Sequence, residues 1–222
     1  EHIKRIFKFS FNVQLISIFS ALIDPAIKYI IGSFYQVSYV SSYEIARRFA
    51  LAISGLFFTA FKIVLPKTSI LKTKEDYRQF ILGEGIKYSR VGLTYSGVVF
   101  GIFTFLIVLV IKLWFHSDES VLIFLLLALP ESINNVGFTI YMFLIGIGKA
   151  HIVALIQFFN VSVISGTLII GFMLFGNIFG ILGYFLTVLL VNIFMLFYTK
   201  SLVDYSVSSF LKYIGVYKII IL

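Results

Sequence analysis

Long apolar stretches, separated by short polar segments, run through the whole chain. A bilayer core of about 30 Å is crossed by roughly 20 consecutive apolar residues in an α-helix. Six stretches reach that length, and apolar residues surround each one instead of forming a single stripe. They lie at residues 6–31, 45–65, 91–115, 121–147, 152–175 and 178–198. The pattern predicts an all-α integral membrane fold, with a six-transmembrane-helix bundle over residues 1–200 and a cytoplasmic tail or a truncated further helix over 201–222.

Composition excludes a water-soluble domain of this length. Hydrophobic residues make up 60% of the 222 residues and charged residues 13%, with a mean hydropathy of +1.04. Soluble domains carry roughly 25% charged residues and could not bury so much apolar surface in one core. The absence of cysteine excludes disulfides and thiolate metal sites. The chain starts at Glu1 and stops within an apolar run, so we expect both ends to be cuts in a longer protein.

Lysine and arginine lie in alternate connections between the predicted spans. They occur at residues 4–8, in the linker 62–90, at Lys149 and in the tail 200–218, which all fall on one side of the membrane. In a soluble protein the net charge of +8 would indicate a nucleic-acid partner, but the positive-inside bias of membrane proteins explains it here. We therefore expect membrane lipids and no nucleic acid as partners, with both ends of the segment in the cytoplasm. The polar segments at 33–42 and 116–120 are expected to be loops on the opposite side.

The linker KTKEDYRQFILGEGIKYSR, at residues 72–90, permits two interpretations. Four of its apolar residues have near-helical spacing among lysines and arginines: Tyr77, Phe80, Ile81 and Ile86. This spacing is typical of a helix that lies on the cytoplasmic membrane surface against anionic lipid. The alternative is a cytoplasmic extension of the third span, interrupted at Gly83 and Gly85.

The first span carries an acid and a base beside a proline. Asp24 and Lys28 are four residues apart, which places them on one helix face and lets them pair. Each alone would cost about 2.5–3.5 kcal/mol at mid-membrane. Pro25 removes one helix hydrogen bond and favours a kink. Because intramembrane ionisable residues mark transport pathways, we expect the pair to face a cavity; the alternative is a structural pair near the outer interface, with Lys28 reaching outward.

The second span opens with Glu44, Arg47 and Arg48. Glu44 can pair with either arginine at helical spacing, and adjacent arginines point in different directions, so at most one of them faces inward. A guanidinium group holds phosphate through a two-pronged fork, which makes a site for an anionic head group one interpretation. The other interpretation is an interfacial salt-bridge cluster that closes the helix end.

The fourth span contains the polar stretch LPESINN near its middle. Glu131, Asn134 and Asn135 share one helix face at i, i+3 and i+4, directly after Pro130. The cost of polar groups in hydrocarbon excludes a lipid-facing position for this face. We expect it to line a cavity, with hydrogen bonding between helices as the alternative.

The remaining polar and small residues favour packing over chemistry. We expect helix–helix packing at Gln157, Asn160 and Asn192, and close helix approach at Gly176, Gly180 and Gly183. The histidines at 116 and 151 fall on opposite sides of the membrane and form no metal pair, and no serine has suitable histidine and aspartate partners. The sequence therefore predicts no metal, no cofactor and no catalytic residues, and we expect the protein not to be an enzyme.

Several short motifs follow one another in the order found in one transporter family. They are Asp24, IG at 31–32, YEIA at 43–46 with Arg48, and LP at 65–66 with Ser69. Through them the chain resembles the second half of the polysaccharide-biosynthesis (O-antigen type) flippases of the multidrug/oligosaccharidyl-lipid/polysaccharide (MOP) exporter superfamily. The stretches GIGKAHIVALIQ and LFGNIFGILGYFLTVLLVNI resemble a turn and the last pair of helices in that half. The chain departs from the pattern at Ser42, where many members have glycine.

The resemblance implies the C-terminal lobe of a two-lobe MOP-type transporter, whose partner is the missing N-terminal lobe of the same chain. The implied substrate is an undecaprenyl-diphosphate-linked oligosaccharide, carried across the bacterial cytoplasmic (inner) membrane by alternating access for surface polysaccharide or lipopolysaccharide synthesis. On that basis we expect Lys28 and either Arg47 or Arg48 to meet the diphosphate. Three acids would set the charge of these bases or couple transport to an ion: Asp24, Glu44 and Glu131.

Three other functions stay open. An ion-coupled drug antiporter of the same superfamily would need a more apolar cavity with a lone carboxylate. A membrane enzyme acting on lipid-linked sugars would need a long external loop or an intramembrane His/Asp site. A structural membrane subunit predicts that charge-neutral substitutions at Asp24, Lys28 and Arg48 leave activity intact.

Overall fold

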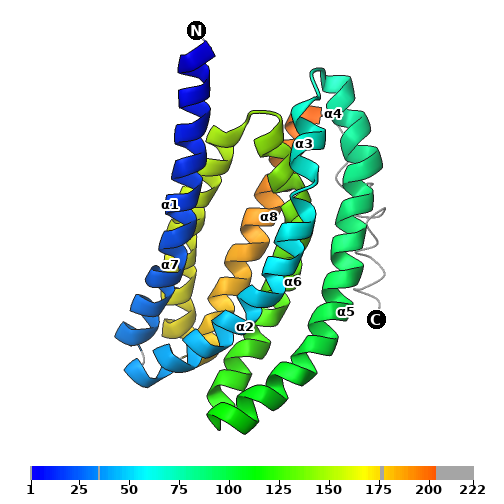
Figure 1. The fold of residues 1–222 in the computed structure, drawn as a ribbon. Helices are drawn as coiled ribbons and strands as arrows, with labels where there is room; N and C mark the ends of the chain where they lie inside the picture. The colour runs from blue at the N-terminus through cyan, green and yellow to red at the C-terminus, as the bar shows by residue number, and fades with distance from the viewer. Residues whose placement is uncertain (1, 35, 176–177, 204–222) are drawn as a thin grey trace.

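The computed structural model describes residues 2–34, 36–175 and 178–203, which form a bundle of long helices (Figure 1). The α-helices are α1 (His2–Phe34), α2 (Val37–Phe61), α3 (Val64–Ser69), α4 (Lys74–Phe80), α5 (Ile86–Val110), α6 (Asp118–Gly146), α7 (Ala150–Phe175) and α8 (Leu182–Val203). The π-helical turns η1 (Ile81–Gly85) and η2 (Ile111–Phe115) flank α5, and the 3-10 turn η3 (Ile178–Ile181) precedes α8. No residue in this described part forms a β-strand, so the all-α prediction is confirmed for it.

Most of these helices are long and apolar enough to cross a bilayer. Five helical segments of the described chain qualify: Ile6–Phe34, Val37–Ser69, Lys74–Phe115, Ala150–Phe175 and Phe179–Val203. α6 makes a sixth when its two parts, which meet at an angle of 43°, are taken as one span. Large apolar side chains remain exposed along these segments, as lipid contact requires. The helices indicate a multi-pass membrane protein.

The long helices pack in two groups that meet through α6 and α8. α1 packs mainly against α7, whereas α2 packs mainly against α6 (Figure 1). α6 also packs against α5 and α8, and α8 also packs against α7. α1 and α2 are consecutive in the sequence, yet each has its largest contact with another helix. Helices of both groups, together with α8, line a cavity.

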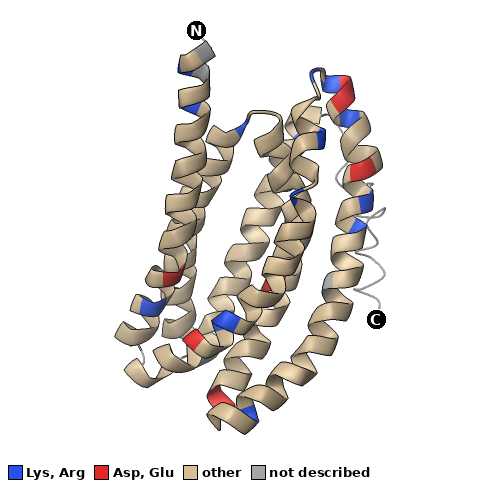
Figure 2. Cartoon of the chain, in the orientation of Figure 1, with Lys and Arg blue, Asp and Glu red and all other residues tan. Residues whose placement is uncertain are grey.

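Charged residues distinguish the two ends of the bundle. Figure 2 shows most lysines and arginines gathered beside the N-terminus, α3, α4 and the connection from α6 to α7; we call this the basic end. The opposite end carries Lys112, whose ammonium group pairs with Asp118 at 3.2 Å. The charge asymmetry is the one that the sequence predicts. The assignment of the basic end to the cytoplasm stays a prediction.

The two expected loops at the opposite end are mostly helical. α1 continues to Phe34 and α2 begins at Val37, so the loop predicted at 33–42 is wrong. Directly after the predicted loop, the buried Tyr43 of α2 donates its hydroxyl to Asp24 of α1 at 3.0 Å, which fixes this end of α2 against α1. α6 begins directly after Ser117, whose hydroxyl accepts a hydrogen bond from a first-turn amide.

From Lys74 on, the linker at residues 72–90 is a helical extension of the third span, which agrees with the second of the two interpretations. α4, η1 and α5 belong to one helical segment, Lys74–Phe115. Gly83 and Gly85 lie in the π-helical turn and do not interrupt the segment as the sequence suggested. The ammonium group of Lys67 in α3 lies 2.6 Å from a carboxylate oxygen of Glu84, which fastens α3 to this extension.

Small residues bring α7 and α8 close together. A Cβ atom added at Gly183 would lie 2.3 Å from the backbone oxygen of Thr167, a clash that no side-chain rotation relieves. A Cβ atom at Gly171 would lie 2.5 Å from the backbone oxygen of Gly180. The predicted close approach is confirmed for Gly180 and Gly183, whereas Gly176 lies outside the described residues.

Candidate functional site

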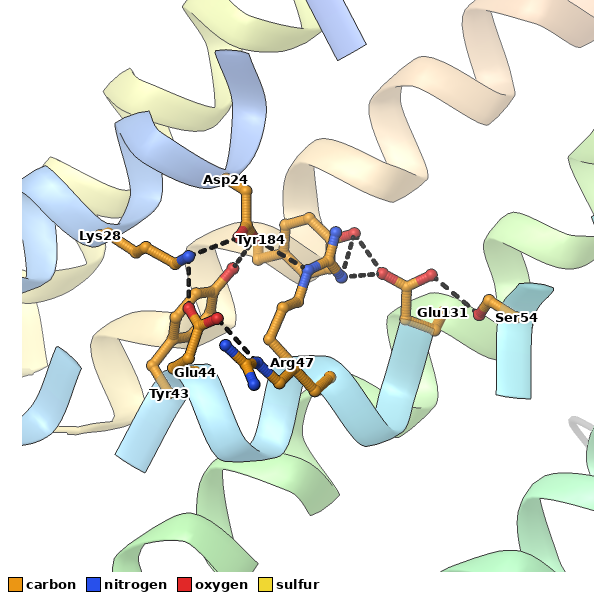
Figure 3. A network of polar contacts seen from close by, with 9 residues as sticks. Asp24, Lys28, Tyr43, Glu44, Arg47, Ser54, Glu131 and Tyr184 are labelled. Carbon is orange, nitrogen blue, oxygen red and sulfur yellow. Dashed lines mark hydrogen bonds and ion pairs between the residues drawn. The ribbon is translucent and has the colours of Figure 1, made fainter. Parts of the chain in front are cut away.

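A cavity of about 500 Å³ lies among α1, α2, α6, α7 and α8. This volume falls in the range of about 300–1,000 Å³ that is typical of small-molecule sites. The charged residues of its described lining are Asp24 of α1, Arg47 of α2 and Glu131 of α6, and Tyr184 of α8 lies beside them. These four side chains belong to one network of polar contacts (Figure 3).

Arg47 is the centre of this network. Only 8% of the residue is exposed, so its charge needs partners within the protein. Its Nε lies 3.2 Å from Asp24, and one terminal nitrogen pairs with Glu131. The same nitrogen donates to the Tyr184 hydroxyl at 3.4 Å, and the guanidinium carbon lies 5.4 Å from the centre of the Tyr184 ring. One arginine therefore ties together α1, α2, α6 and α8.

Glu131 receives hydrogen bonds at both carboxylate oxygens. Tyr184 donates its hydroxyl to one oxygen at 2.6 Å, and Ser54 donates to the other at 3.1 Å. Together with the Arg47 ion pair, these contacts compensate the cost of burying the Glu131 carboxylate, since the residue is only 2% exposed. Three charge-assisted contacts explain how an acid can stay inside an apolar bundle.

The network continues from Asp24 toward the outer surface of α2. Asp24 pairs with Lys28 at 2.9 Å, so the pairing predicted from the one-turn spacing is confirmed. Lys28 also pairs with Glu44, and Glu44 pairs with Arg48 at 2.9 Å. The Arg48 side chain is 78% exposed, so of the two adjacent arginines only Arg47 points inward. Lys28, Glu44 and Arg48 are absent from the described lining of the cavity, and the last two line a separate surface hollow with Phe115.

The charges of the network balance. Asp24, Glu44 and Glu131 supply three negative charges, and Lys28, Arg47 and Arg48 supply three positive charges. Arg47, the inward-facing base, is already bound to two carboxylates. An anionic ligand in the cavity would compete with these carboxylates for the guanidinium group.

The network lies at one end of the cavity. The lining residues run over 16–24 in α1, 47–58 in α2, 131–141 in α6 and 184–195 in α8. Asp24 is the last of these in α1, while Arg47, Glu131 and Tyr184 are the first in their helices. Because α1 runs toward the opposite end and the other three run away from it, all four side chains close the cavity on the side away from the basic end.

Some of the asparagine and glutamine side chains line the cavity, and others are buried in the packing between helices. Asn134 lines the cavity beside Glu131, but Asn135 is fully buried and does not reach the described lining. Gln157 and Asn160, assigned to packing from the sequence, line the cavity from α7. Asn192 packs as expected: its amide nitrogen donates to the Val188 backbone oxygen at 2.8 Å, and a Cβ at Gly137 would meet its oxygen at 1.8 Å.

Sequence reasoning missed three members of the network: Tyr43, Ser54 and Tyr184. Tyr43 stood within the YEIA stretch, and its position four residues before Arg47 was a usable signal. Ser54 and Tyr184 are isolated in apolar runs, and nothing in their neighbourhood marks them. Both find Glu131 only through the fold, across 77 and 53 residues of chain.

No protein-family model matches this chain, and comparisons with curated proteins and with solved structures give no match either. Within the described residues, no group of three or more His, Asp or Glu side chains is placed to hold a metal ion. The site is therefore characterised by its own geometry: a cavity with a charge-balanced network at one end.

Proposed function

We propose that this chain is one lobe of a transporter that moves an undecaprenyl-diphosphate-linked oligosaccharide across the bacterial cytoplasmic membrane by alternating access. The resemblance of Asp24, YEIA at 43–46 and LP at 65–66 to the O-antigen flippase pattern suggests the family. The observation that supports the function best is a buried arginine, Arg47, at the end of a cavity between membrane-length helices. In this proposal Arg47 receives the diphosphate.

Packing alone gives no reason for such a network. Replacing a buried ion pair by apolar residues of similar volume is often neutral or stabilising, so charges inside a bundle need another explanation. Ionisable residues within membrane helices are found mostly where a substrate or ion passes. Arg47 suits a diphosphate because guanidinium binds phosphate oxygens in a two-pronged fork.

The charge balance supports a specific sequence of events. The diphosphate competes with Asp24 and Glu131 for Arg47, and the ties between α1 and α2 at the opposite end then loosen. Those ties are the contacts of Asp24 with Arg47 and Tyr43, and of Lys28 with Glu44. Their release lets the group of α1 and α7 separate from α2 and α6, which opens the cavity on that side.

A second candidate is an ion-coupled drug antiporter. The described cavity lining itself holds two carboxylates, Asp24 and Glu131, and one arginine, because Lys28, which pairs with Asp24, lies outside the lining. In that case the ligand would pair with a carboxylate in place of Arg47. The two candidates differ in the sign of the charge that enters the cavity.

The test is complementation of a flippase-deficient bacterium with the full-length gene. We expect Arg47→Gln to abolish surface glycan and Arg47→Lys, which keeps the charge but loses the fork, to restore only part of it. Arg78→Gln is the matched control, because Arg78 is exposed on α4 and outside the network. The amount of each variant in the membrane is measured in parallel, so that loss of protein is separated from loss of transport.

Normal surface glycan with a stably inserted Arg47→Gln variant would contradict the diphosphate role. Failure of the unsubstituted gene to restore glycan, together with resistance to cationic drugs in the same cells, would favour the antiporter. Loss of glycan in the control as well as in the Arg47 variants would show that the assay responds to any change of charge.

A further inference from the structure

The cavity lining has a second zone that the charged network does not use. Beyond the network, the polar lining residues are uncharged and come from α1, α6 and α7. They are Ser17, Ser20, Asn134, Tyr141, Gln157 and Asn160, which we call the neutral wall. They extend from the network toward the basic end, because the α1 lining begins at Ile16 and the α6 lining ends at Tyr141.

Hydrogen-bonding capacity remains in the neutral wall. Asn160 donates to the Gln157 side-chain oxygen at 3.4 Å, and Gln157 lies within reach of the Tyr141 hydroxyl. Each amide offers two donor hydrogens and two acceptor lone pairs, so these contacts use only part of what Gln157 and Asn160 can form. Both residues are partly exposed on the cavity side.

Helix–helix attachment does not account for these amides. The contact between Gln157 and Asn160 lies within α7 and holds no second helix. The contact between Gln157 and Tyr141 does join α7 to α6, but these helices are already joined by the turn at 147–149. An amide in a membrane helix is costly without partners, so a neutral wall facing a cavity indicates a ligand with hydroxyl or amide groups.

Aromatic rings face the same cavity. Phe58 of α2 and Phe138 of α6 line it, and their ring centres lie 4.6 Å apart in an edge-to-face arrangement. Phe138 and Tyr141 continue the cluster with ring centres 5.4 Å apart. The cavity therefore combines amides, which both donate and accept, with apolar ring surfaces. A sugar ring presents the matching chemistry, with hydroxyl groups around its rim and C–H groups on its faces.

We propose that the neutral wall is a sugar subsite that binds the first units of the glycan while the diphosphate lies at the network end. This inference rests on the proposed function and adds the residues that recognise the glycan. Gln157 and Asn160 hydrogen-bond the hydroxyl groups, and Phe138 packs against a ring face. The wall then determines which glycans pass, whereas Arg47 binds the diphosphate that all of them share.

The test compares two lipids in vesicles that contain the full-length protein. One lipid is undecaprenyl diphosphate carrying an oligosaccharide, and the other is undecaprenyl diphosphate alone. We expect the double variant Gln157→Leu/Asn160→Leu to move the glycan-bearing lipid about tenfold more slowly, which corresponds to about 1.4 kcal/mol. It should move the bare lipid at a rate within twofold of the unsubstituted protein. Gln14→Leu, which removes an exposed amide of α1 outside the cavity, should change neither rate.

The outcomes separate the sugar subsite from the function itself. Equal slowing of both lipids, or no slowing of either, overturns the subsite while leaving the transporter proposal intact. Movement of neither lipid by the unsubstituted protein overturns both proposals. The milder variant Asn160→Ser covers the case in which the double variant does not fold, and a selective loss of about threefold for the glycan-bearing lipid is expected from it.

Discussion

Two polar residues of α6, one helical turn apart, lie in opposite environments. Glu131 is 2% exposed, and its two oxygens bind Arg47, Tyr184 and Ser54. Asn135 is fully buried, and neither its side-chain nitrogen nor its oxygen has a hydrogen-bond partner among the described residues. The carboxylate, which costs more free energy to bury than the amide, is thus the group with hydrogen-bond and ion-pair partners.

Asn135 belongs to a small set of unpaired residues where α5 and α6 pack. Ser89 of α5 and Thr139 of α6 are also fully buried, and their hydroxyls have no partner in the described part of the chain. A Cβ at Gly92 would lie 3.6 Å from the Asn135 backbone oxygen. Gly92 of α5 and Asn135 of α6 therefore lie at the same level. Because the two helices are antiparallel, Ser89 and Thr139, each about one turn closer to the basic end, also lie at one level. We call these residues, Ser89, Asn135 and Thr139, the α5–α6 layer.

Polar residues of the network hold this bundle together, whereas those of the α5–α6 layer do not. The network joins four helices through charge-assisted bonds, so loss of one member leaves other buried charges without partners. Within the described residues the polar side-chain atoms of the α5–α6 layer form no hydrogen bond, so loss of one of them removes only a desolvation cost. Substitutions in the two regions should therefore change stability in opposite directions.

The largest effect is expected at Arg47. Arg47→Leu leaves Asp24 and Glu131 without their shared cation inside the bundle, which should cost about 3–5 kcal/mol of unfolding free energy. The measurement is SDS titration of the full-length protein in mixed micelles, followed by circular dichroism. Arg48→Leu is the control, because the 78% exposed Arg48 side chain should contribute no more than about 1 kcal/mol. Equal losses in the two variants would contradict the distinction between an inward and an outward arginine.

A smaller loss is expected at Tyr184. Tyr184→Phe keeps the ring beside Arg47 but removes the hydroxyl that donates to Glu131 at 2.6 Å. Bonds to charged groups are worth about 1.5–3 kcal/mol, and the remaining contacts of Glu131 should hold the loss to that range. The same titration applies, with Tyr29→Phe as the control, since Tyr29 is 78% exposed. A loss no larger than that of the control would mean that Arg47 and Ser54 suffice for Glu131.

Local spacing was enough to predict part of this site. The one-turn separation of Asp24 and Lys28 gave their pairing, and the adjacency of Arg47 and Arg48 meant that only one could face inward. Both features follow from the geometry of a single helix. The long apolar runs likewise predicted the helices, because in lipid the backbone N–H and C=O groups of each run must hydrogen-bond within that run.

The parts that depend on contacts between distant segments could not be predicted. Glu131, Asn134 and Asn135 share a broad helix face, yet only the fold determines that Asn135 is fully buried and does not reach the described cavity lining. The Tyr43 hydroxyl of α2 reaches Asp24 on a neighbouring helix, across 19 residues of chain. A polar residue in an apolar run looks the same in the sequence whether or not it finds a partner.

The smallest effect, and the one of opposite sign, is expected in the α5–α6 layer. Thr139→Val replaces the unpartnered hydroxyl by a methyl group of similar size, which should raise the unfolding free energy by about 1 kcal/mol. Thr199→Val is the matched control: Thr199 is also fully buried, but its hydroxyl donates to the Met195 backbone oxygen at 2.8 Å. Loss of that bond should lower the unfolding free energy by about 0.5–1 kcal/mol in the same SDS titration. If Thr139→Val destabilised the protein as much as Thr199→Val, the hydroxyl of Thr139 would have to be partnered in the membrane, and the contrast between the two regions of α6 would disappear.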